Sequence, residues 1–267
     1  MKKEKSHLSA REYVADQAAS GRYHFVSSDA RAALGTSIAA TKLALNRLAK
    51  QGVIASPAQG FYVIVPPEYR SLGCLPADQF IPALMSKLGQ PYYAGLLSAA
   101  QYHGAAHHRP QQFQVMLSKN RRPIHCGKVD VAFTARKRLE EIPLQRFNTP
   151  RGTIEVSTPE ATAIDLVGYQ HNIGGLDGVA TVLAELAEKI DPEKLAAVAA
   201  TAPLPWAQRL GYLLERVGAA AATPPLERYV RQHARQSAPL APTTQASHSQ
   251  RDERWKLYIN AEIEAET

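Results

Sequence analysis

The sequence predicts an α+β fold: an N-terminal winged helix-turn-helix followed by a mixed domain with a mostly antiparallel sheet and several helices. Two observations predict this class. Within residues 1–70, a helix, a short strand, two helices joined at Gly35 and a hairpin follow one another. Between residues 113 and 217, alternating strand-like stretches precede helices whose apolar residues recur at helical spacing.

Helix-capping residues delimit the first elements of the chain. Ser9, with Glu12 three residues later, has capping-box spacing and opens a helix over residues 10–20. Residues 23–26 favour a short strand. The next helix is expected over residues 30–34, and the residues before it offer side-chain caps: Ser27, Ser28 and Asp29.

The third helix of this segment is longer and amphipathic. Thr36 or Ser37 is expected to cap it. Its buried face is expected to comprise Ile38, Leu45 and Leu48, with Thr41 and Ala49 between them. A hairpin follows, in which residues 53–55 and 61–65 flank a turn that contains Gly60.

This pattern predicts a DNA-contacting surface. A winged helix-turn-helix places its second motif helix in the major groove and its wing along the backbone. Lys42 and Asn46 match base edges or phosphates, and Leu43 matches a thymine methyl group. The residues expected to contact DNA are Ser37, Lys42, Leu43, Asn46, Arg47, Lys50, Gln59 and Tyr62. Winged helices also serve as docking or dimerisation modules, and an exposed Leu43 fits that alternative best.

Positive charge is unevenly distributed along the chain. The 267 residues include 31 Lys and Arg against 24 Asp and Glu, a net charge of +7. Residues 1–70 hold ten basic and five acidic side chains, residues 101–151 ten and three, and residues 152–267 ten and fifteen. Because phosphate neutralisation dominates nucleic-acid affinity, the two basic segments favour a polyanionic partner. An ordinary solvated surface is the alternative.

The chain divides by composition into four parts. Residues 1–70 are the predicted winged-helix domain, residues 80–236 a second domain, residues 237–250 a linker rich in Pro, Ser and Thr, and residues 251–267 a tail with a returning edge strand. Helices of the second domain are expected at 80–88, 92–105, 158–166, 176–190 and 204–217, and strands at 113–117, 129–133, 142–147 and 153–156. Ser157 and Glu160 have a second capping-box spacing.

No catalytic, metal or cofactor site is predicted. Possible metal ligands gather in one segment: His103, His107, His108, His125 and Cys126. The Glu that a metalloprotease motif would place between two histidines is missing, and the ligands would come from separate elements. Three carboxylates further on lack the neighbouring Lys of a two-metal nuclease: Glu155, Glu160 and Asp165. We therefore expect a protein that is not an enzyme and binds no metal or cofactor.

The cysteine count and hydropathy predict a soluble, cytoplasmic protein. Two cysteines, Cys74 and Cys126, are too few for a disulfide framework and suit small buried positions. No run approaches the roughly 18–20 apolar residues of a membrane span. The basic start of the chain lacks the apolar stretch of a signal peptide.

The sequence resembles the AbiEi antitoxins of the AbiE abortive-infection (type IV) toxin–antitoxin systems. The blocks that carry the resemblance follow the winged-helix segment: YYAGLLSAAQYHGAAHHRPQQFQV, RRPIHCGKV, VSTPEATAIDLV, GGLDGVATVLAELAE and WAQRLGYLLERVG. The resemblance implies an N-terminal winged helix that represses its own operon by binding operator inverted repeats in double-stranded DNA. It also implies a C-terminal domain that counteracts a nucleotidyltransferase-like toxin without a stable complex.

The basic middle segment is interpreted as a second nucleic-acid face. Its cations cluster around predicted strands and turns: Lys119, Arg121, Arg122, Lys128, Arg136, Lys137 and Arg138. Side chains so placed can follow a phosphate backbone, and each contact steepens the salt dependence of binding. The alternative is that this face receives the toxin or its RNA substrate. A second function class also stays open, an interaction protein that binds the toxin without sequence-specific DNA binding.

Overall fold

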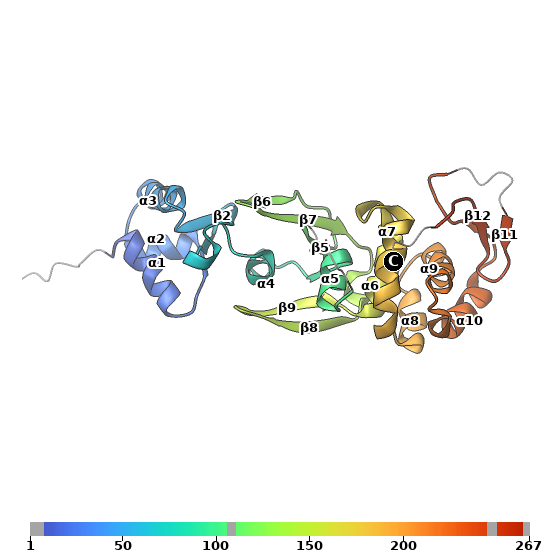
Figure 1. Ribbon diagram of the computed structural model, residues 1–267. Helices are drawn as coiled ribbons and strands as arrows, with labels where there is room; N and C mark the ends of the chain where they lie inside the picture. The colour runs from blue at the N-terminus through green and yellow to red at the C-terminus, as the bar shows by residue number, and fades with distance from the viewer. Residues whose placement is uncertain (1–7, 106–110, 245–249, 264–267) are drawn as a thin grey trace, which may run out of the picture.

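Three parts follow one another along the molecule in the computed structural model, which describes residues 8–105, 111–244 and 250–263 (Figure 1). A winged-helix arrangement lies at one end, a six-stranded sheet with two helices in the middle, and a helical part with a small sheet at the other end. The predicted α+β class is confirmed. Of the described helices, none is both long and apolar enough to span a membrane.

The N-terminal part has the element order of a winged helix. Its elements are α1 (Ala10–Ala19), β1 (His24–Val26), α2 (Ser27–Leu34), α3 (Ile38–Lys50), β2 (Ile54–Ala58) and β3 (Phe61–Ile64). The strands form an antiparallel sheet in the order β1-β3-β2. The predicted capping box of α1 is present, since Ser9 and Glu12 bond each other's backbone amides at 3.2 and 2.8 Å. Ser37 caps α3 by accepting from the Ala40 amide.

Two local predictions for this part were wrong. Helix α2 begins at Ser27, so Ser27, Ser28 and Asp29 form its first turn instead of capping it, and Val26 stands at the cap position. Ile38 is 69% exposed, although its spacing placed it on the buried face of α3. The buried stripe begins one turn later, at Thr41, whose hydroxyl lies 2.9 Å from that of Thr36. Ile38 therefore lies outside the hydrophobic cluster of the three helices.

The middle of the chain forms a six-stranded sheet. Its strands are β4 (Tyr92–Ala94), β5 (Phe113–Leu117), β6 (Ile124–Cys126), β7 (Val129–Ala135), β8 (Leu144–Thr149) and β9 (Gly152–Ser157). The order is β6-β7-β5-β4-β9-β8. Three neighbouring pairs are antiparallel, and the pairs β5–β7 and β4–β9 are parallel. The prediction of a mostly antiparallel sheet holds, with the parallel pairs as the feature it lacked.

The helix expected over residues 92–105 is a strand followed by a shorter helix. Tyr92–Ala94 pairs with β5 on one side and β9 on the other, and α5 (Leu96–Tyr102) begins after Gly95. The Gly95 amide still donates to Gln114 of β5, so the chain leaves the sheet only at this residue. Tyr93 and Ala94 are fully buried. Pairing on both edges thus overrode the helical spacing of the small residues.

Helix α4 (Ala77–Leu88) joins the winged helix to the sheet. One hydrophobic cluster contains Phe61 and Val63 of the wing, Phe80 and Leu84 of α4, and Val131 of β7, among others. The short connection before α4 includes the buried Cys74 and Leu75. The predicted domain boundary near residues 70–80 is therefore crossed by a continuous core, which sets the orientation of the winged helix on the sheet.

The hairpin β8–β9 provides a second connection between these parts. The Arg151 guanidinium lies 3.2 Å from the ring centroid of Tyr23, in the winged helix. The same guanidinium donates to Gln79 of α4 at 3.0 Å. It also lies 3.4 Å from a Glu68 carboxylate oxygen. Because its planar guanidinium stacks on Tyr23 and also contacts Gln79 and Glu68, Arg151 holds the winged helix against the hairpin.

The C-terminal part is a helical layer with a small sheet. Its helices are α6 (Pro159–Gly168), α7 (Gly175–Leu186), α8 (Pro192–Ala199), α9 (Leu204–Arg216) and α10 (Pro224–His233). Within this part, short 3-10 turns occupy Gln170–Asn172, Ala187–Lys189 and Ala220–Ala222; earlier in the chain, such turns occupy Pro67–Tyr69 and Leu139–Glu141. The small sheet has the order β10-β12-β11, with β10 (Ala238–Pro239), β11 (Gln250–Asp252) and β12 (Leu257–Ile259). Helices α8 and α10 have no counterpart in the sequence-based prediction.

Two further predictions for this part were wrong in detail. Thr158, not Ser157, caps α6, and the Glu160 carboxylate accepts the Asp191 amide at 3.0 Å instead of closing a capping box. Glu160 thus connects α6 to the start of α8. The returning strand is the central strand of the small sheet, not an edge strand, because β12 pairs with β10 and β11. The fully buried Trp255 precedes it.

Candidate nucleic-acid interface

The exposed face of α3 carries the predicted DNA-contacting side chains. Lys42, Leu43, Asn46, Arg47 and Lys50 are all exposed, while Thr41, Leu45 and Leu48 on the other face are buried. Leu43 is 53% exposed, enough for an apolar contact with a partner. The amphipathic pattern of α3 thus leaves one polar face unpartnered within the described residues. Contact of these residues with DNA remains a prediction.

A groove of about 410 Å³ separates α3 from the wing. Its lining residues come from the start of α2, from α3 and from the hairpin: Ser27, Ser28, Arg31, Ile38, Thr41, Lys42, Leu45, Gln59, Gly60 and Tyr62. Arg31 and Ser28 were not among the predicted contacts, although they lie on the first helix of the motif. Both residues lie on the helix that ends at Gly35, and this position next to α3 was the signal that could have indicated them.

The wing is held in place from both sides. Tyr62 stacks on Phe25, with ring centroids 5.5 Å apart. The Lys87 ammonium of α4 donates to the Gln59 carbonyl at 3.3 Å and lies 5.7 Å from the ring centroid of Phe61. The exposed Gln59 side chain therefore projects from a turn whose backbone is fixed. Tyr62 is half-buried, so its ring supports the wing more than it extends from it.

One of the seven residues predicted for the second basic face, Arg136, is not on the surface. Six of its seven cations are exposed or half-buried: Lys119, Arg121, Arg122, Lys128, Lys137 and Arg138. Arg136 is buried, with 2% of its side chain accessible, and therefore cannot reach a phosphate backbone. Arg138 is already engaged, since its guanidinium pairs with Glu141 and donates to the Ala200 carbonyl at 2.6 Å. A nucleic-acid role for the exposed cations remains a prediction.

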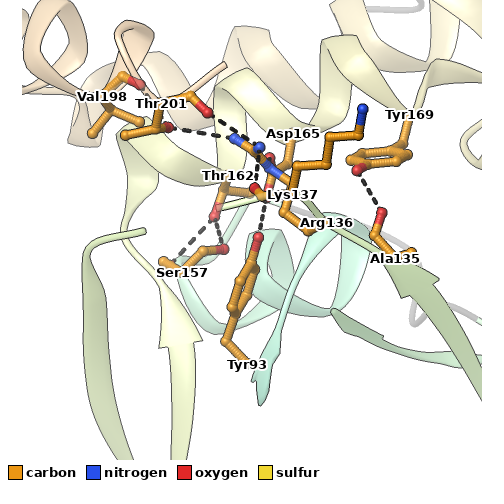
Figure 2. Close-up of polar contacts among 10 residues, drawn as sticks. All are labelled: Tyr93, Ala135, Arg136, Lys137, Ser157, Thr162, Asp165, Tyr169, Val198 and Thr201. Carbon is orange, nitrogen blue, oxygen red and sulfur yellow. Dashed lines mark hydrogen bonds and ion pairs between the residues drawn. The ribbon is translucent and has the colours of Figure 1, made fainter. Parts of the chain in front are cut away.

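Arg136 is the centre of a buried polar network at the junction of the sheet and the helices (Figure 2). Its Nε donates to Asp165 at 2.8 Å, and its Nη1 donates to the Lys137 and Thr201 carbonyls at 2.8 and 3.2 Å. The Tyr93 hydroxyl donates to the second oxygen of Asp165 at 2.6 Å. One guanidinium thus ties β7, α6 and the turn between α8 and α9 together, while Tyr93 adds β4.

Burial controls the titration of this network. It raises the pKa of Asp165, which Arg136 and the Tyr93 hydrogen bond oppose. Burial, together with the charge of Asp165, also raises the pKa of Tyr93, so the phenol keeps its proton at neutral pH and acts as the donor. Burial raises the pKa of Tyr169 to about 12. The Tyr169 hydroxyl donates to the Ala135 carbonyl at 2.7 Å, which anchors the end of α6 to β7.

The suspected metal ligands do not converge where they are described. The His103 Nε2–H donates to the Ser157 carbonyl, 2.7 Å away, and His125 lies 2.6 Å from Asp130. Cys126 is a buried free thiol. Across residues 8–105, 111–244 and 250–263, no group of three or more ligating side chains is arranged for a metal ion. His107 and His108 lie outside the described residues.

The partial burial of His103 predicts that the stability of the fold depends on pH. Burial lowers its pKa below 6.5, more than the Ser157 contact and Glu160 raise it. The unfolded chain therefore takes up a proton at a pH where the folded chain does not, and the free energy of unfolding falls as pH decreases through 6.5. Urea unfolding at pH 7.5 and 5.5 should show this loss. His103→Gln, which retains a donor, should reduce it; an unchanged loss would assign the effect to other groups, such as His24, whose pKa burial also lowers.

Comparison with known proteins places the network inside a recognised domain. The family described as AbiEi antitoxin C-terminal domain matches residues 93–216. The fold is similar to the crystal structure of the RV2827C protein from Mycobacterium tuberculosis, with a TM-score of 0.66 and 17% identity over 93% of this chain and 90% of that chain. No curated protein matches the chain. The matched residues run from β4 to α9, so this part of the chain is similar to the C-terminal domain of the AbiEi antitoxins.

Proposed function

We propose that the chain is the antitoxin and transcriptional autorepressor of a type IV toxin–antitoxin operon. The winged helix binds inverted repeats in its own operator, and the C-terminal domain over residues 80–236 counteracts a nucleotidyltransferase-like toxin without a stable complex. The family match over residues 93–216 supports the antitoxin role. The proposal assigns the protein no catalytic residue and places it in the cytoplasm.

The exposed face of α3 is the observation that carries the DNA-binding part of the proposal. Lys42 and Asn46 are one helical turn apart and exposed, and Arg47 and Lys50 continue the basic face. Asn suits a bidentate contact with adenine, and the cations suit guanine or phosphate. One winged helix reads only a few base pairs. Useful specificity therefore requires two copies on the inverted repeat, whether or not they dimerise in solution.

Substitution on α3 tests this assignment. Lys42→Ala and Asn46→Ala are each expected to weaken binding of the full chain to its upstream region by about tenfold, because a good base contact contributes about 1–3 kcal/mol. Lys189→Ala is the matched control, since it removes one exposed cation from the helical part. Fluorescence anisotropy with a labelled duplex, at one fixed salt concentration, measures the affinities. Wild-type affinity in both α3 variants would contradict the assignment.

The exposed apolar side chains of α3 favour one competing function. Ile38 and Leu43 are 69% and 53% exposed, which suits the docking of another protein. A protein-interaction module would bind the toxin through this helix without sequence-specific DNA binding. The double variant Ile38→Ser with Leu43→Ser separates the two functions. Docking predicts that toxin neutralisation is lost. DNA recognition predicts that neutralisation is retained while operator affinity falls, because Leu43 is one of the expected DNA contacts.

A further inference from the structure

A pocket of about 600 Å³ lies over the Arg136 network, at the junction of the sheet and the helical part. Its walls are formed by residues at the ends of β5, β7 and α6 and by the turn that leads into α9. The side chains that matter for the argument are Lys137, Arg138, Tyr169, Thr201 and Trp206. The volume is in the range of small-molecule sites, which are lined by apolar and aromatic groups with a few polar ones.

The position of the pocket follows from the two parallel strands β5 and β7. Leu117 pairs with Ala135, so the strands end level with each other, and Ser118 and Arg136 leave them side by side. The Arg136 amide still donates to the Leu117 carbonyl at 2.7 Å. In open sheets, ligands bind outside the carboxyl ends of parallel strands. The pocket occupies that position for this pair.

The floor of the pocket is held rigidly before any ligand arrives. The buried Arg136 bonds carbonyls on two of its walls, at Lys137 and Thr201, and its Nη2 approaches the Thr201 hydroxyl at 3.4 Å. Its guanidinium lies 5.2 Å from the ring centroid of Trp206. Because these groups are already satisfied by one another, a ligand meets a preformed site and little ordering is required on binding.

The chemistry of the walls selects a flat ligand with a negative charge. Tyr169 and Trp206 meet edge to face, with ring centroids 5.2 Å apart, and form an aromatic corner. Lys137 is exposed at the rim, and its ammonium has no ion pair with any described residue; Figure 2 shows it extending beside Tyr169. Arg138 adds a second cation, partly neutralised by Glu141. Aromatic surface beside positive charge is the combination that binds unpaired nucleotides.

We propose that this pocket binds one nucleotide, with its base against Tyr169 and Trp206 and its phosphate at Lys137 and Arg138. The nucleotide is either free or part of an unpaired strand, since the shared chemistry is a base joined to a phosphate. A base inside a duplex is stacked and cannot enter. This inference shares Lys137 and Arg138 with the predicted second basic face, but it does not depend on operator binding by α3.

The fluorescence of Trp206 can report ligand binding in the pocket. The chain has two tryptophans, and the other, Trp255, is fully buried, so a ligand in the pocket should change the emission of Trp206 alone. The full chain is titrated with the four nucleoside monophosphates, with an eight-nucleotide single-stranded RNA and with the corresponding duplex. A saturable change with a monophosphate identifies a free nucleotide as ligand, and a change with the single strand alone identifies an unpaired strand. Both results support the site.

Two variants locate the binding. Ala202→Phe fills the pocket from the turn before α9 without changing charge, and Lys137→Ala removes the rim cation. Each should weaken binding by about tenfold, the scale of one base-stacking contact. Lys128→Ala removes an exposed cation of the same predicted face that does not line this pocket, and it should change binding by less than twofold. Thermal unfolding of each variant verifies that it is folded.

Three results would overturn the proposal: no saturable signal with any nucleotide or strand, saturable binding of the duplex as tight as that of the single strand, or equal weakening by Lys128→Ala and Lys137→Ala. Operator affinity of the Ala202→Phe variant is measured in parallel and should match wild type, because α3 lies in the winged helix. Loss of nucleotide binding with intact operator binding therefore concerns the pocket alone. Loss of operator binding in the Lys42 and Asn46 variants concerns the winged helix alone.

Discussion

Arg136→Met is expected to lower the free energy of unfolding by about 3–5 kcal/mol, because it leaves the Asp165 carboxylate buried without its partner. The substitution also leaves the Thr201 and Lys137 carbonyls without their donor. Both side chains of the pair are almost inaccessible to water, so solvent cannot replace the lost contacts. The matched control is Arg138→Ala, two residues away and half exposed, which should cost much less because solvent replaces the lost contacts.

Denaturant unfolding of Arg136→Met, Asp165→Leu and the double variant measures the coupling. The double variant should be more stable than Arg136→Met alone, since removing both charges ends the cost of an unpaired one. In a chain of this size the single substitution should lower the melting temperature by on the order of 10 °C. A loss no larger than that of Arg138→Ala would show that the network does not hold the sheet and the helices together.

Trp255→Ala is the second substitution with a large expected effect, a loss of about 3–5 kcal/mol. Trp255 is fully buried and donates from its indole nitrogen to Glu215 of α9 at 2.9 Å. Its ring lies so close to Gly211 that a methyl group there would be 2.0 Å from it. The segment before β12 is therefore packed into the helical part.

Thermal unfolding monitored by circular dichroism tests this expectation. The control is Glu253→Ala, an exposed residue two positions earlier, whose surface ion pairs with Arg251 and Lys256 contribute little. A melting temperature for Trp255→Ala that matches the control would show that residues 250–259 are an appendage. Gly211→Ala offers an independent probe of the same contact from α9, since its methyl group would displace the Trp255 ring.

The winged-helix elements were predictable from sequence because their signals are local. Ser9 and Glu12 cap one helix, Ser37 caps another, and glycines mark the turns, so each boundary depends on residues within four positions of it. Ile38 shows the limit of this reasoning. Its spacing matches the buried stripe, but whether a neighbour covers the first turn of α3 is decided by the placement of the other helices.

The errors in the middle of the chain have one common cause. The strand β4 is three residues long and is defined by neighbours at β5 and β9, more than fifteen residues away in sequence. Arg136 follows a strand within a basic run, so its spacing could not distinguish it from Lys137 and Arg138. Its partner Asp165 lies 29 residues further on. Only the packing of α6 on the sheet brings that carboxylate to Arg136.

The candidate site likewise has features that local sequence predicts and features that depend on long-range packing. The polar face of α3 follows from helical periodicity and could be predicted, whereas the groove beside it includes Arg31 from another helix. The pocket over Arg136 combines residues from 118 to 206, which no local motif connects. Sequence reasoning therefore identifies surfaces on single elements and misses sites assembled between elements.

Repression of a reporter gene fused to the chain's own upstream region tests the central claim most directly. The wild-type protein is predicted to repress the reporter. The double variant Lys42→Ala with Asn46→Ala is predicted to lose most of that repression while it still neutralises the proposed nucleotidyltransferase-like toxin. Repression by the double variant equal to that of wild type would contradict the account, because the exposed face of α3 would then not be the surface that reads the operator.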